Sequence, residues 1–141
     1  MSADRDAAAI IAALGLAPHP EGGHYRESWR ETSAPRGHGT AIYYLLQAGE
    51  VSHWHRVDAV EIWHYYAGAP LELRIAAPEA KAAAHRLGPG VLTGEQPQLL
   101  VPSRHWQSAR SLGAWTLVGC TVSPAFEFSG FEMAAKGWEP G

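Results

Sequence analysis

The sequence predicts an all-β sandwich or small barrel that carries one short helix at its N-terminal end. After Pro18, short runs rich in aromatic and β-branched residues recur, and Gly, Pro and Ser separate them. The chain has 141 residues, of which 46% are hydrophobic, so it can bury about two-thirds of its unfolded surface in a single core. We therefore expect one domain over residues 1–141, with a helix over 2–14 and a β-barrel over 24–135.

The helix is predicted from the spacing of its apolar residues. Ala7, Ile10, Ile11 and Leu14 follow the i, i+3, i+4, i+7 pattern of one helical face. A glycine follows directly and a proline soon after, which is how helices commonly end. We expect this helix to pack on the outside of the barrel.

The expected strands are seven runs that follow the helix. They are HYRESWRE, TAIYYLLQ, EIWHYYAG, LELRIAA, QLLVP, AWTLVGCTVSP and FEMA. The segment PEAKAAAHRLG has helical propensity, but it is short and stands between two strand-like runs, so we expect a loop that leads into a strand.

Charge and cysteine content exclude several classes of protein. The formal net charge is −3, and Arg and Lys are scattered singly, so we expect no binding to nucleic acid or to an anionic membrane. Cys120 is the only cysteine, which excludes an intrachain disulfide and suggests a small buried strand residue. There is no signal peptide pattern and no apolar run of membrane-spanning length, so a cytoplasmic protein is expected.

The stretch EVSHWHRVDAVEIWHYYAG gathers three of the chain's eight histidines near an acidic residue. Successive strand residues point to opposite faces, so His53 and His55 share one face of the first run. Glu61, Trp63 and Tyr65 share one face of the second. We therefore expect His55 and Glu61 to converge from adjacent strands.

The same stretch resembles the first motif of the cupins, β-sandwich barrels of the jelly-roll type, which reads G-x5-H-x-H-x3-4-E-x6-G. Gly49, His55, Glu61 and Gly68 stand at the right spacing, whereas Val57 replaces the second histidine. The sequence is thus similar to a cupin site that has lost an imidazole.

The second cupin motif, G-x5-P-x-G-x2-H-x3-N, is matched less completely. Pro102 is in place, but Arg104 replaces the glycine and Gln107 replaces the histidine. Gly94 is displaced by two residues, and the final asparagine is missing. Longer phrases, among them PHPEGGHYRESWR, WHRVDAVEIWHYYAGAPL and WTLVGCTVSPAFEFSGFEMA, resemble a compact cupin branch with no assigned function.

The resemblance leaves three interpretations of the site open. In the first, His55 exchanges protons while Glu61 or Asp58 orients it and Tyr65 serves as the opposite acid, as in cupin sugar epimerases. In the second, His55, Glu61 and Gln107 hold a divalent transition metal, although full cupin sites use three histidines and a carboxylate.

The third interpretation is a pocket that binds a small molecule without chemistry. Its walls would come from aromatic and amide side chains, namely Tyr43, Trp63, Gln98, Trp106 and Gln107. We expect His55, Glu61, Gln98 and Gln107 to face the barrel interior. The turn HPEGGHYRE either closes the pocket or is only structural. The resemblance also implies a homodimer, because a partner strand would cover exposed sheet edges.

Our overall prediction is a small-molecule-binding cupin, an isomerase or epimerase acting on a polar, sugar-like ligand without metal. A metal-dependent oxygenase or isomerase and a non-catalytic binding or storage module are the alternatives.

Overall fold

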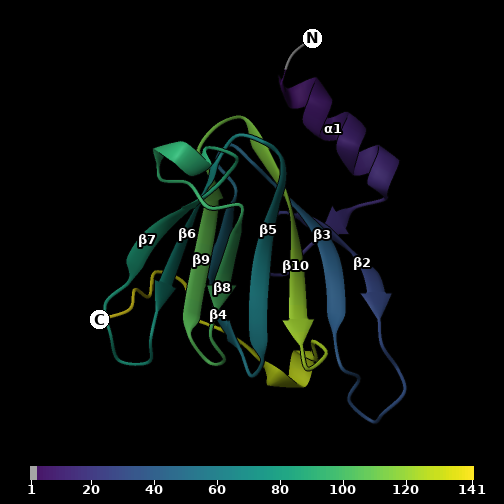
Figure 1. The fold of residues 1–141 in the computed structure, drawn as a ribbon, viewed down its shortest axis with the longest axis vertical. Coiled ribbons are helices and arrows are strands. Elements are labelled where there is room, and N and C mark those ends of the chain that lie inside the picture. Colours follow the sequence, from purple (N-terminus) through teal and green to yellow (C-terminus); the bar gives the residue numbers. More distant parts are fainter. Residues whose placement is uncertain (1–2) are drawn as a thin grey trace.

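The computed structural model describes residues 3–141, which form two antiparallel sheets that face each other (Figure 1). The strand order is β1-β2-β3-β10-β5-β8 in the six-stranded sheet and β11-β4-β9-β6-β7 in the five-stranded sheet. The prediction of an all-β jelly-roll sandwich with one short N-terminal helix is confirmed.

The strands lie between residues 17 and 133. Their bounds are β1 Ala17–Pro18, β2 His24–Arg30, β3 Thr40–Gln47, β4 Val51–Val57, β5 Val60–Gly68, β6 Leu71–Ala76, β7 Ala83–Leu87, β8 Gln98–Val101, β9 Trp106–Ser111, β10 Trp115–Ser123 and β11 Phe131–Met133. Two short 3-10 helices, η1 Val91–Thr93 and η2 Phe128–Gly130, interrupt the connections.

All seven predicted strands form, and the segment that begins at Pro78 is indeed a loop leading into β7. Strand β9 was not predicted. Its sequence WQSARS has no apolar alternation, because the buried positions include the polar residues Gln107, Ser108 and Ser111. A strand whose interior side chains are polar is the first indication that the sandwich holds a polar site.

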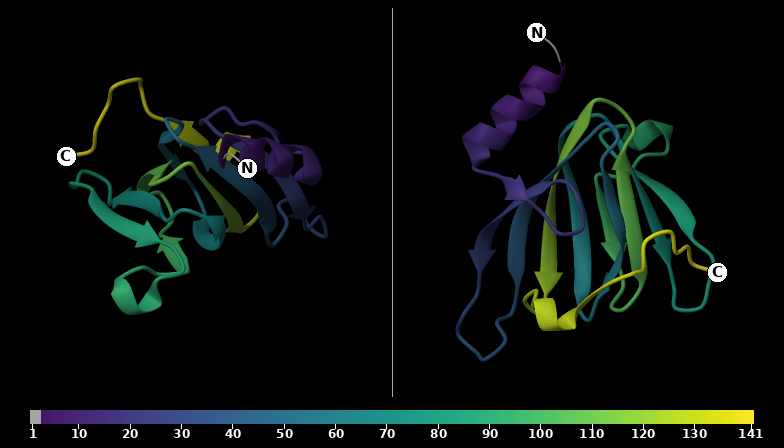
Figure 2. Two further views of the ribbon diagram at one scale, coloured as in Figure 1. Left: turned by 90° about the horizontal axis from the view of Figure 1, so that it is seen from above. Right: turned by 180° about the vertical axis from the view of Figure 1, so that it is seen from behind.

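Helix α1, Ala3–Leu14, lies outside the sandwich at one end of the six-stranded sheet (Figures 1 and 2). Ser2, which we also assigned to the helix, is outside the described residues. Ala7 and the partly buried Ile10 and Leu14 pack against Leu45 and its neighbours, as the spacing predicts. No helix in residues 3–141 has the length and apolar character needed to cross a bilayer.

Two separate clusters of buried residues fill part of the interior between the sheets. Eleven buried residues make one core cluster: Tyr44, Leu46, Trp63, Leu71, Leu73, Leu87, Leu99, Val101, Ala109, Val118 and Cys120. A second cluster of Val57, Ala59 and Val122 lies under Phe126 and Phe131. Between these clusters the sandwich is hollow, and this space is the cavity described below.

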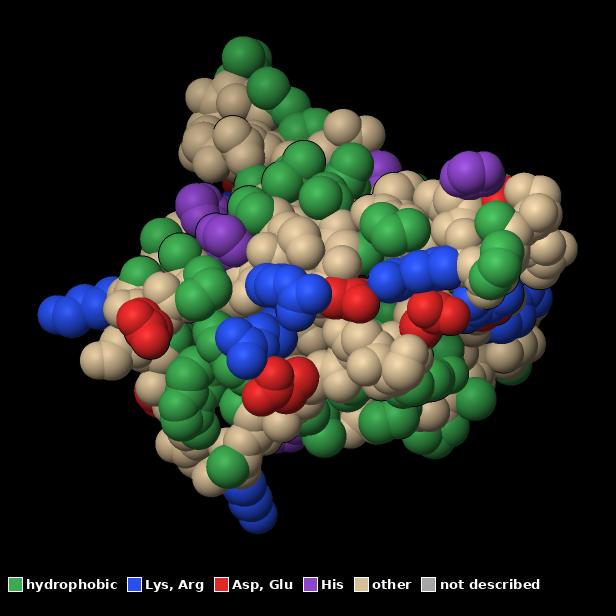
Figure 3. Space-filling model, turned by 90° about the horizontal axis from the view of Figure 1, so that it is seen from below, with side chains coloured by type: hydrophobic (Ala, Val, Ile, Leu, Met, Phe, Trp, Pro, Cys, Tyr) green, Lys and Arg blue, Asp and Glu red, His purple; other side chains and the backbone are tan. Residues whose placement is uncertain are grey.

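The chain beyond β10 folds back over the open side of the sandwich. Phe126, Phe128 and Phe131 contact one another edge to face, with ring centroids 5.0–5.9 Å apart. Arg36 fixes this segment, because its guanidinium donates to both carboxylate oxygens of Asp58 and to the carbonyl oxygen of Ala125. On the lower face, basic and acidic side chains lie next to one another rather than in separate patches (Figure 3).

Candidate functional site

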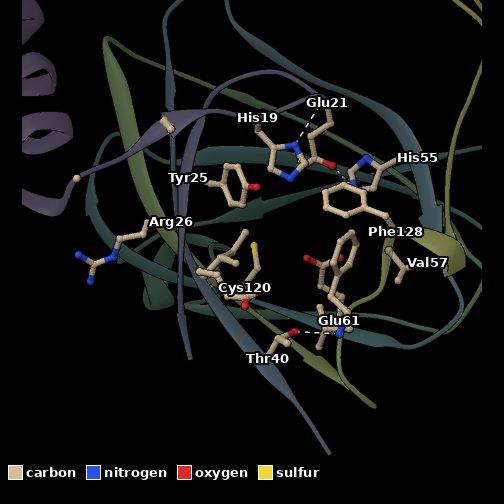
Figure 4. Close-up of a pocket in the computed structure, with 16 residues that line it drawn as sticks. His19, Glu21, Tyr25, Arg26, Thr40, His55, Val57, Glu61, Cys120 and Phe128 are labelled. Carbon is tan, nitrogen blue, oxygen red and sulfur yellow. Dashed lines mark hydrogen bonds and ion pairs between the residues drawn. The ribbon is translucent and has the colours of Figure 1, made fainter. Parts of the chain in front are cut away.

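A cavity of about 390 Å³ lies between the two sheets and opens beside the end of α1 (Figure 4). This volume is at the small end of the range for ligand pockets. The lining residues come from both sheets and from the aromatic C-terminal segment: Gly15, Ala17, His19, Glu21, Tyr25, Arg26, Glu27, Thr40, Ile42, His55, Val57, Glu61, Cys120, Val122, Phe126 and Phe128.

His55 and Glu21 form a buried ion pair at one wall of the cavity. The Nε2 atom of His55 is 2.9 Å from Oε2 of Glu21, and the two residues are only 2% and 5% exposed. The turn between β1 and β2 delivers Glu21, and its position is fixed because the His53 amide donates to the Glu21 carbonyl oxygen. The turn HPEGGHYRE therefore contributes to the cavity wall.

The hydrogen bonds of His55 define its protonation state. Its Nδ1 atom is 2.7 Å from the carbonyl oxygen of His53, which can only accept, and its Nε2 atom faces the Glu21 carboxylate. Both ring nitrogens therefore carry a proton. Burial opposes this charge, but Glu21, assisted by Glu61, outweighs burial and raises the pKa of His55 to about 9. Burial likewise opposes the charge on Glu21, yet the attraction of His55 lowers its pKa below the usual value.

His19 is the neutral imidazole of the site. Its Nδ1 atom accepts a hydrogen bond of 3.0 Å from the backbone amide of Glu21, so the proton is on Nε2. Burial lowers the pKa of His19 and supports the neutral form. Its ring packs edge to face on Tyr25, with centroids 4.3 Å apart. The Tyr25 hydroxyl points toward the middle of the cavity (Figure 4).

Glu61 faces the ion pair from β5, and a fixed amide holds it. The Nε2 atom of Gln107 donates to Oε1 of Glu61 at 2.9 Å, and the Trp63 indole N–H donates to Oε1 of Gln107 at 2.7 Å. An indole nitrogen can only donate, so the orientation of the Gln107 amide is set. Glu61 is thus held in one position by two buried side chains behind it.

The carboxyl group of Glu61 titrates near neutral pH. Burial is the main cause, and the negative charge of Glu21 adds to it, while His55 opposes both; the result is a pKa of about 7. Cys120 lies beside it on β10, and burial raises the pKa of its thiol well above the usual value, so it stays protonated. Glu61 is therefore the group of the cavity best poised to take up and release a proton.

The structure brings His55 and Glu61 to the same cavity, as alternation along the strands suggested. Two details differ. The carboxylate that pairs with His55 is Glu21, because Asp58 is engaged by Arg36. His53 does not share the face of His55, since a register shift between β4 and β9 leaves it exposed.

Tyr65 and Gln98 do not line the cavity, so their predicted places are wrong. Tyr65 is on the Glu61 face of β5 but lies beyond Trp63, and its hydroxyl donates to the carbonyl oxygen of Gly68 at 2.6 Å. Gln98 is exposed on the outer face of the sheet, with its amide 3.3 Å from His64. The cavity tyrosine is Tyr25 instead.

The four other predicted wall residues are not in the lining either, and Gln107 reaches the cavity only through its hydrogen bond to Glu61. Tyr43 points outward and packs with the α1 cluster, under the guanidinium of Arg26. Trp63 is in the solid core, 1% exposed, and reaches the site only through Gln107. Trp106 belongs to a separate cluster with Trp54 on the other sheet. Large aromatics fill a β core readily, and here they fill it rather than line the cavity.

Sequence reasoning missed the roles of His19, Glu21 and Tyr25. The available signal was an acidic residue before two glycines in HPEGGHYRE. Gly22 and Gly23 both have positive φ, 111° and 78°, and a Cβ at Gly22 would collide with the carbonyl oxygen of Val51. This close approach of the turn to β4 is what puts Glu21 against His55.

The chain matches a known protein family. Residues 8–134 match the family model Cupin_5, described as Cupin superfamily (DUF985), so the match covers most of the chain. The chain belongs to the cupin superfamily. A comparison with curated proteins finds no significant match.

Two solved structures match this chain over most of its length. Protein SO0799 from Shewanella oneidensis is 40% identical, with a TM-score of 0.86, and the match covers 90% of this chain and 83% of that one. A hypothetical protein from Leishmania major is 30% identical, with a TM-score of 0.82, over 89% and 85% of the two chains. Oxalate decarboxylase from Bacillus subtilis shares the fold alone, at 14% identity and a TM-score of 0.66, over 82% of this chain and 29% of that one.

The cupin motifs account for unusual backbone in this structure. Gly49 and Gly68 of the first motif have φ of 83° and 89°. Arg104, at the glycine of the second motif, has φ of 66°, one of two positive values among non-glycine residues in the described part of the chain. Arg104 thus has a left-handed backbone at the position where the motif has a glycine.

The residues present do not fit a cupin metal. Val57 occupies the position of the second histidine and lines the cavity with a side chain that has no donor atom. Gln107 occupies that of the third, and its oxygen is already engaged by Trp63, so it turns an N–H toward Glu61. Both nitrogens of His55 already have partners, Nε2 the Glu21 carboxylate at 2.9 Å and Nδ1 the His53 carbonyl oxygen at 2.7 Å. No group of three or more His, Cys, Asp or Glu side chains within residues 3–141 is arranged to hold a metal ion.

Proposed function

We propose that this cupin is a metal-independent isomerase or epimerase that moves a proton on a small, polar, sugar-like ligand bearing a carbonyl group. The observation that carries the proposal is Glu61: a buried carboxyl group in the cavity wall, held from behind by Gln107, with a pKa of about 7. A general base works best when its pKa lies near the working pH.

In this proposal the Glu61 carboxylate takes a proton from the carbon next to the carbonyl group. The electron pair moves to the carbonyl oxygen, which becomes an enolate. The Nε2–H of the neutral His19 and the hydroxyl of Tyr25 are the uncharged donors available to stabilise that oxygen. For an epimerisation, the Tyr25 hydroxyl gives its proton to the opposite face of the same carbon, and exchange with water then restores Tyr25 and Glu61. For an isomerisation, Glu61 returns its proton to the former carbonyl carbon while the neighbouring hydroxyl group passes its proton to the former carbonyl oxygen.

The ion pair has a supporting role. The positive charge of His55 opposes the effects of burial and of Glu21 on Glu61, so it limits how far the pKa of Glu61 rises. Because both protons of His55 are directed to acceptors of the protein, His55 acts on the ligand through the field of its charge rather than as the base.

Deuterium exchange tests the proposal. The protein is incubated in D₂O with a panel of reducing sugars and keto sugars, and exchange at the carbon next to the carbonyl is followed by proton NMR. We expect exchange with at least one member, slowed by about a hundredfold or more in Glu61→Gln. The control Glu72→Gln, which alters a carboxylate on the other sheet paired with Arg110, should keep the exchange rate. Binding without exchange would favour the alternative, a non-catalytic binding module.

We also propose a homodimer formed through the edge of the six-stranded sheet. Strand β8 has one unpaired edge, and it exposes Leu100, while the neighbouring β5 exposes Tyr66. Light scattering after size exclusion tests this proposal. Leu100→Asp should give a monomer if this edge is the interface, whereas Leu92→Asp, on the exposed η1, should not.

A further inference from the structure

The charges that face the cavity are unequal in number. Glu21 and Glu61 are carboxyl groups, and His55 is the cation that faces them. The charge of His55 is already shared with Glu21 and with a backbone carbonyl oxygen, and His19 is neutral. An ionised Glu61 is therefore a negative charge whose hydrogen-bond donors, the amide of Gln107 and the thiol of Cys120, are both uncharged.

Among the side chains that the structure describes, those of residues 6–141, no Lys or Arg points its charge into this space. Arg26 is the one basic residue in the lining, and its guanidinium points away from the cavity and lies 5.5 Å from the centre of the Tyr43 ring (Figure 4). Arg36, at the aromatic segment, is held between two carboxylates, Asp58 and Glu127. The nearest basic groups are thus already neutralised or directed outward.

The rim of the cavity carries charges of both signs. Gly15, the residue that follows α1, lines the cavity, so the C-terminal end of the helix is at its rim. This end carries a partial negative charge, and the guanidinium of Arg26 lies beside Gly15, where it offsets that charge from outside the cavity.

We propose that the cavity takes an uncharged, hydroxyl-bearing ligand, an unphosphorylated sugar or a close relative, and excludes its anionic counterparts. This inference rests on the proposed function and concerns the same site. A phosphate or carboxylate would be buried beside Glu21 and Glu61, and the one guanidinium of the lining, that of Arg26, points away from it. A hydroxyl group can instead donate to these carboxylates, and Ile42, Val57 and Val122 offer apolar contact to its carbon skeleton.

Pairs that consist of a neutral sugar and its anionic derivative test this inference. Glucose, galactose and mannose are compared with glucuronate, galacturonate and mannose 6-phosphate, with dissociation constants measured by ligand-observed NMR at pH 8. We expect at least one neutral sugar to bind, and its anionic partner to bind at least tenfold more weakly. An anionic sugar that binds as tightly as its neutral partner overturns the inference, and so does the absence of binding by all three neutral sugars.

A variant of Glu61 tests whether the cavity itself discriminates between neutral and anionic sugars. Glu61→Gln removes the negative charge and keeps the shape, so the ratio between neutral and anionic sugars should fall at least threefold. The control Glu72→Gln changes the net charge of the chain equally and should leave the ratio unchanged. A ratio that is the same in both variants counts against the inference.

The same experiments separate this inference from the proposed function. Neutral sugars that bind selectively but exchange no proton leave the charge selection standing and refute the acid–base proposal. Proton exchange into an anionic sugar that binds as tightly as its neutral partner supports the acid–base proposal and refutes the charge selection.

Discussion

The Nε2 atom of His55 lies 2.9 Å from the carboxylate of Glu21, and both residues are almost fully buried from solvent. This pair joins the first turn of the barrel to β4. We expect Glu21→Gln and His55→Gln each to lower the free energy of unfolding by about 3–5 kcal/mol, because each leaves an uncompensated buried charge. The double variant should lose less than the sum of both. Urea unfolding measures all three.

The surface pair of Arg110 and Glu72, at 3.1 Å, is the control for this cycle. Its removal should cost less than about 1 kcal/mol because water screens it. If the double variant loses as much free energy of unfolding as the two single variants together, His55 and Glu21 do not stabilise each other as a buried pair.

Glu61 should control the rate and pH dependence of any proton transfer. Replacement of Glu61 by Gln should lower the exchange rate by about 10²–10⁴-fold, the usual contribution of a general base. In the natural protein the rate should rise with pH through an inflection close to 7, where Glu61 loses its proton. Rates of deuterium exchange between pH 5 and 8.5 measure both effects. A rate profile that is flat across pH 7 would assign the base to another group.

Stability should fall as Glu61 ionises. Its folded pKa of about 7 lies above its ordinary value of 4.5, so its contribution to stability is complete below pH 4.5 and is lost as the pH rises through 7. The free energy of unfolding of Glu61→Gln, relative to the natural protein, should therefore increase by up to roughly 3 kcal/mol between these two pH values. Urea unfolding at several pH values tests this difference. The variant Glu72→Gln should show no such trend.

Restoring the lost imidazoles should create a metal site. The natural chain places Val57 and Gln107 where the cupin motifs have histidines, and we expect zinc, nickel or manganese to leave its melting temperature unchanged. Val57→His combined with Gln107→His returns two ligands beside His55 and Glu61, and zinc should then raise the melting temperature by several degrees. Elemental analysis after dialysis gives the stoichiometry. If zinc raises the melting temperature of the natural chain equally, the conclusion that its residues do not fit a metal ion is wrong.

Arg104 offers a test of backbone strain. Its φ of 66° lies in the left-handed region, where a side chain costs about 1–2 kcal/mol. Arg104→Gly should therefore raise the free energy of unfolding by up to about 1 kcal/mol, after the entropy cost of glycine is deducted. The control Arg86→Gly, in the exposed strand β7, should lower stability instead. Thermal unfolding compares the two.

The fold was predictable because its signals are local and repeated. Apolar alternation located the strands that have one apolar face, and the glycine spacing of the motif located Gly49 and Gly68. Strand β9 was not predicted because its buried residues are polar and form hydrogen bonds across the interior, as Gln107 does with Glu61. Periodicity detects apolar burial, and it cannot detect a buried amide whose partner is 46 residues away.

The site was only half predictable. His55 and Glu61 followed from strand alternation, whereas Glu21 depends on a turn whose path is set by its contact with β4. The choice among tyrosines failed for a similar reason. Tyr65 shares the face of Glu61, but Trp63 stands between them, and side-chain volume along one strand decides which residue reaches the open space.

The aromatic segment that follows β10 has a consequence for biosynthesis. Phe126 and Phe128 help to enclose the cavity, and β11 pairs with β4, so residues near position 130 complete a wall begun near position 20. A ribosome must therefore release almost the whole domain before the emerging polypeptide can retain a ligand. Small molecules can then stabilise the finished protein in the cell, but they cannot guide its early folding.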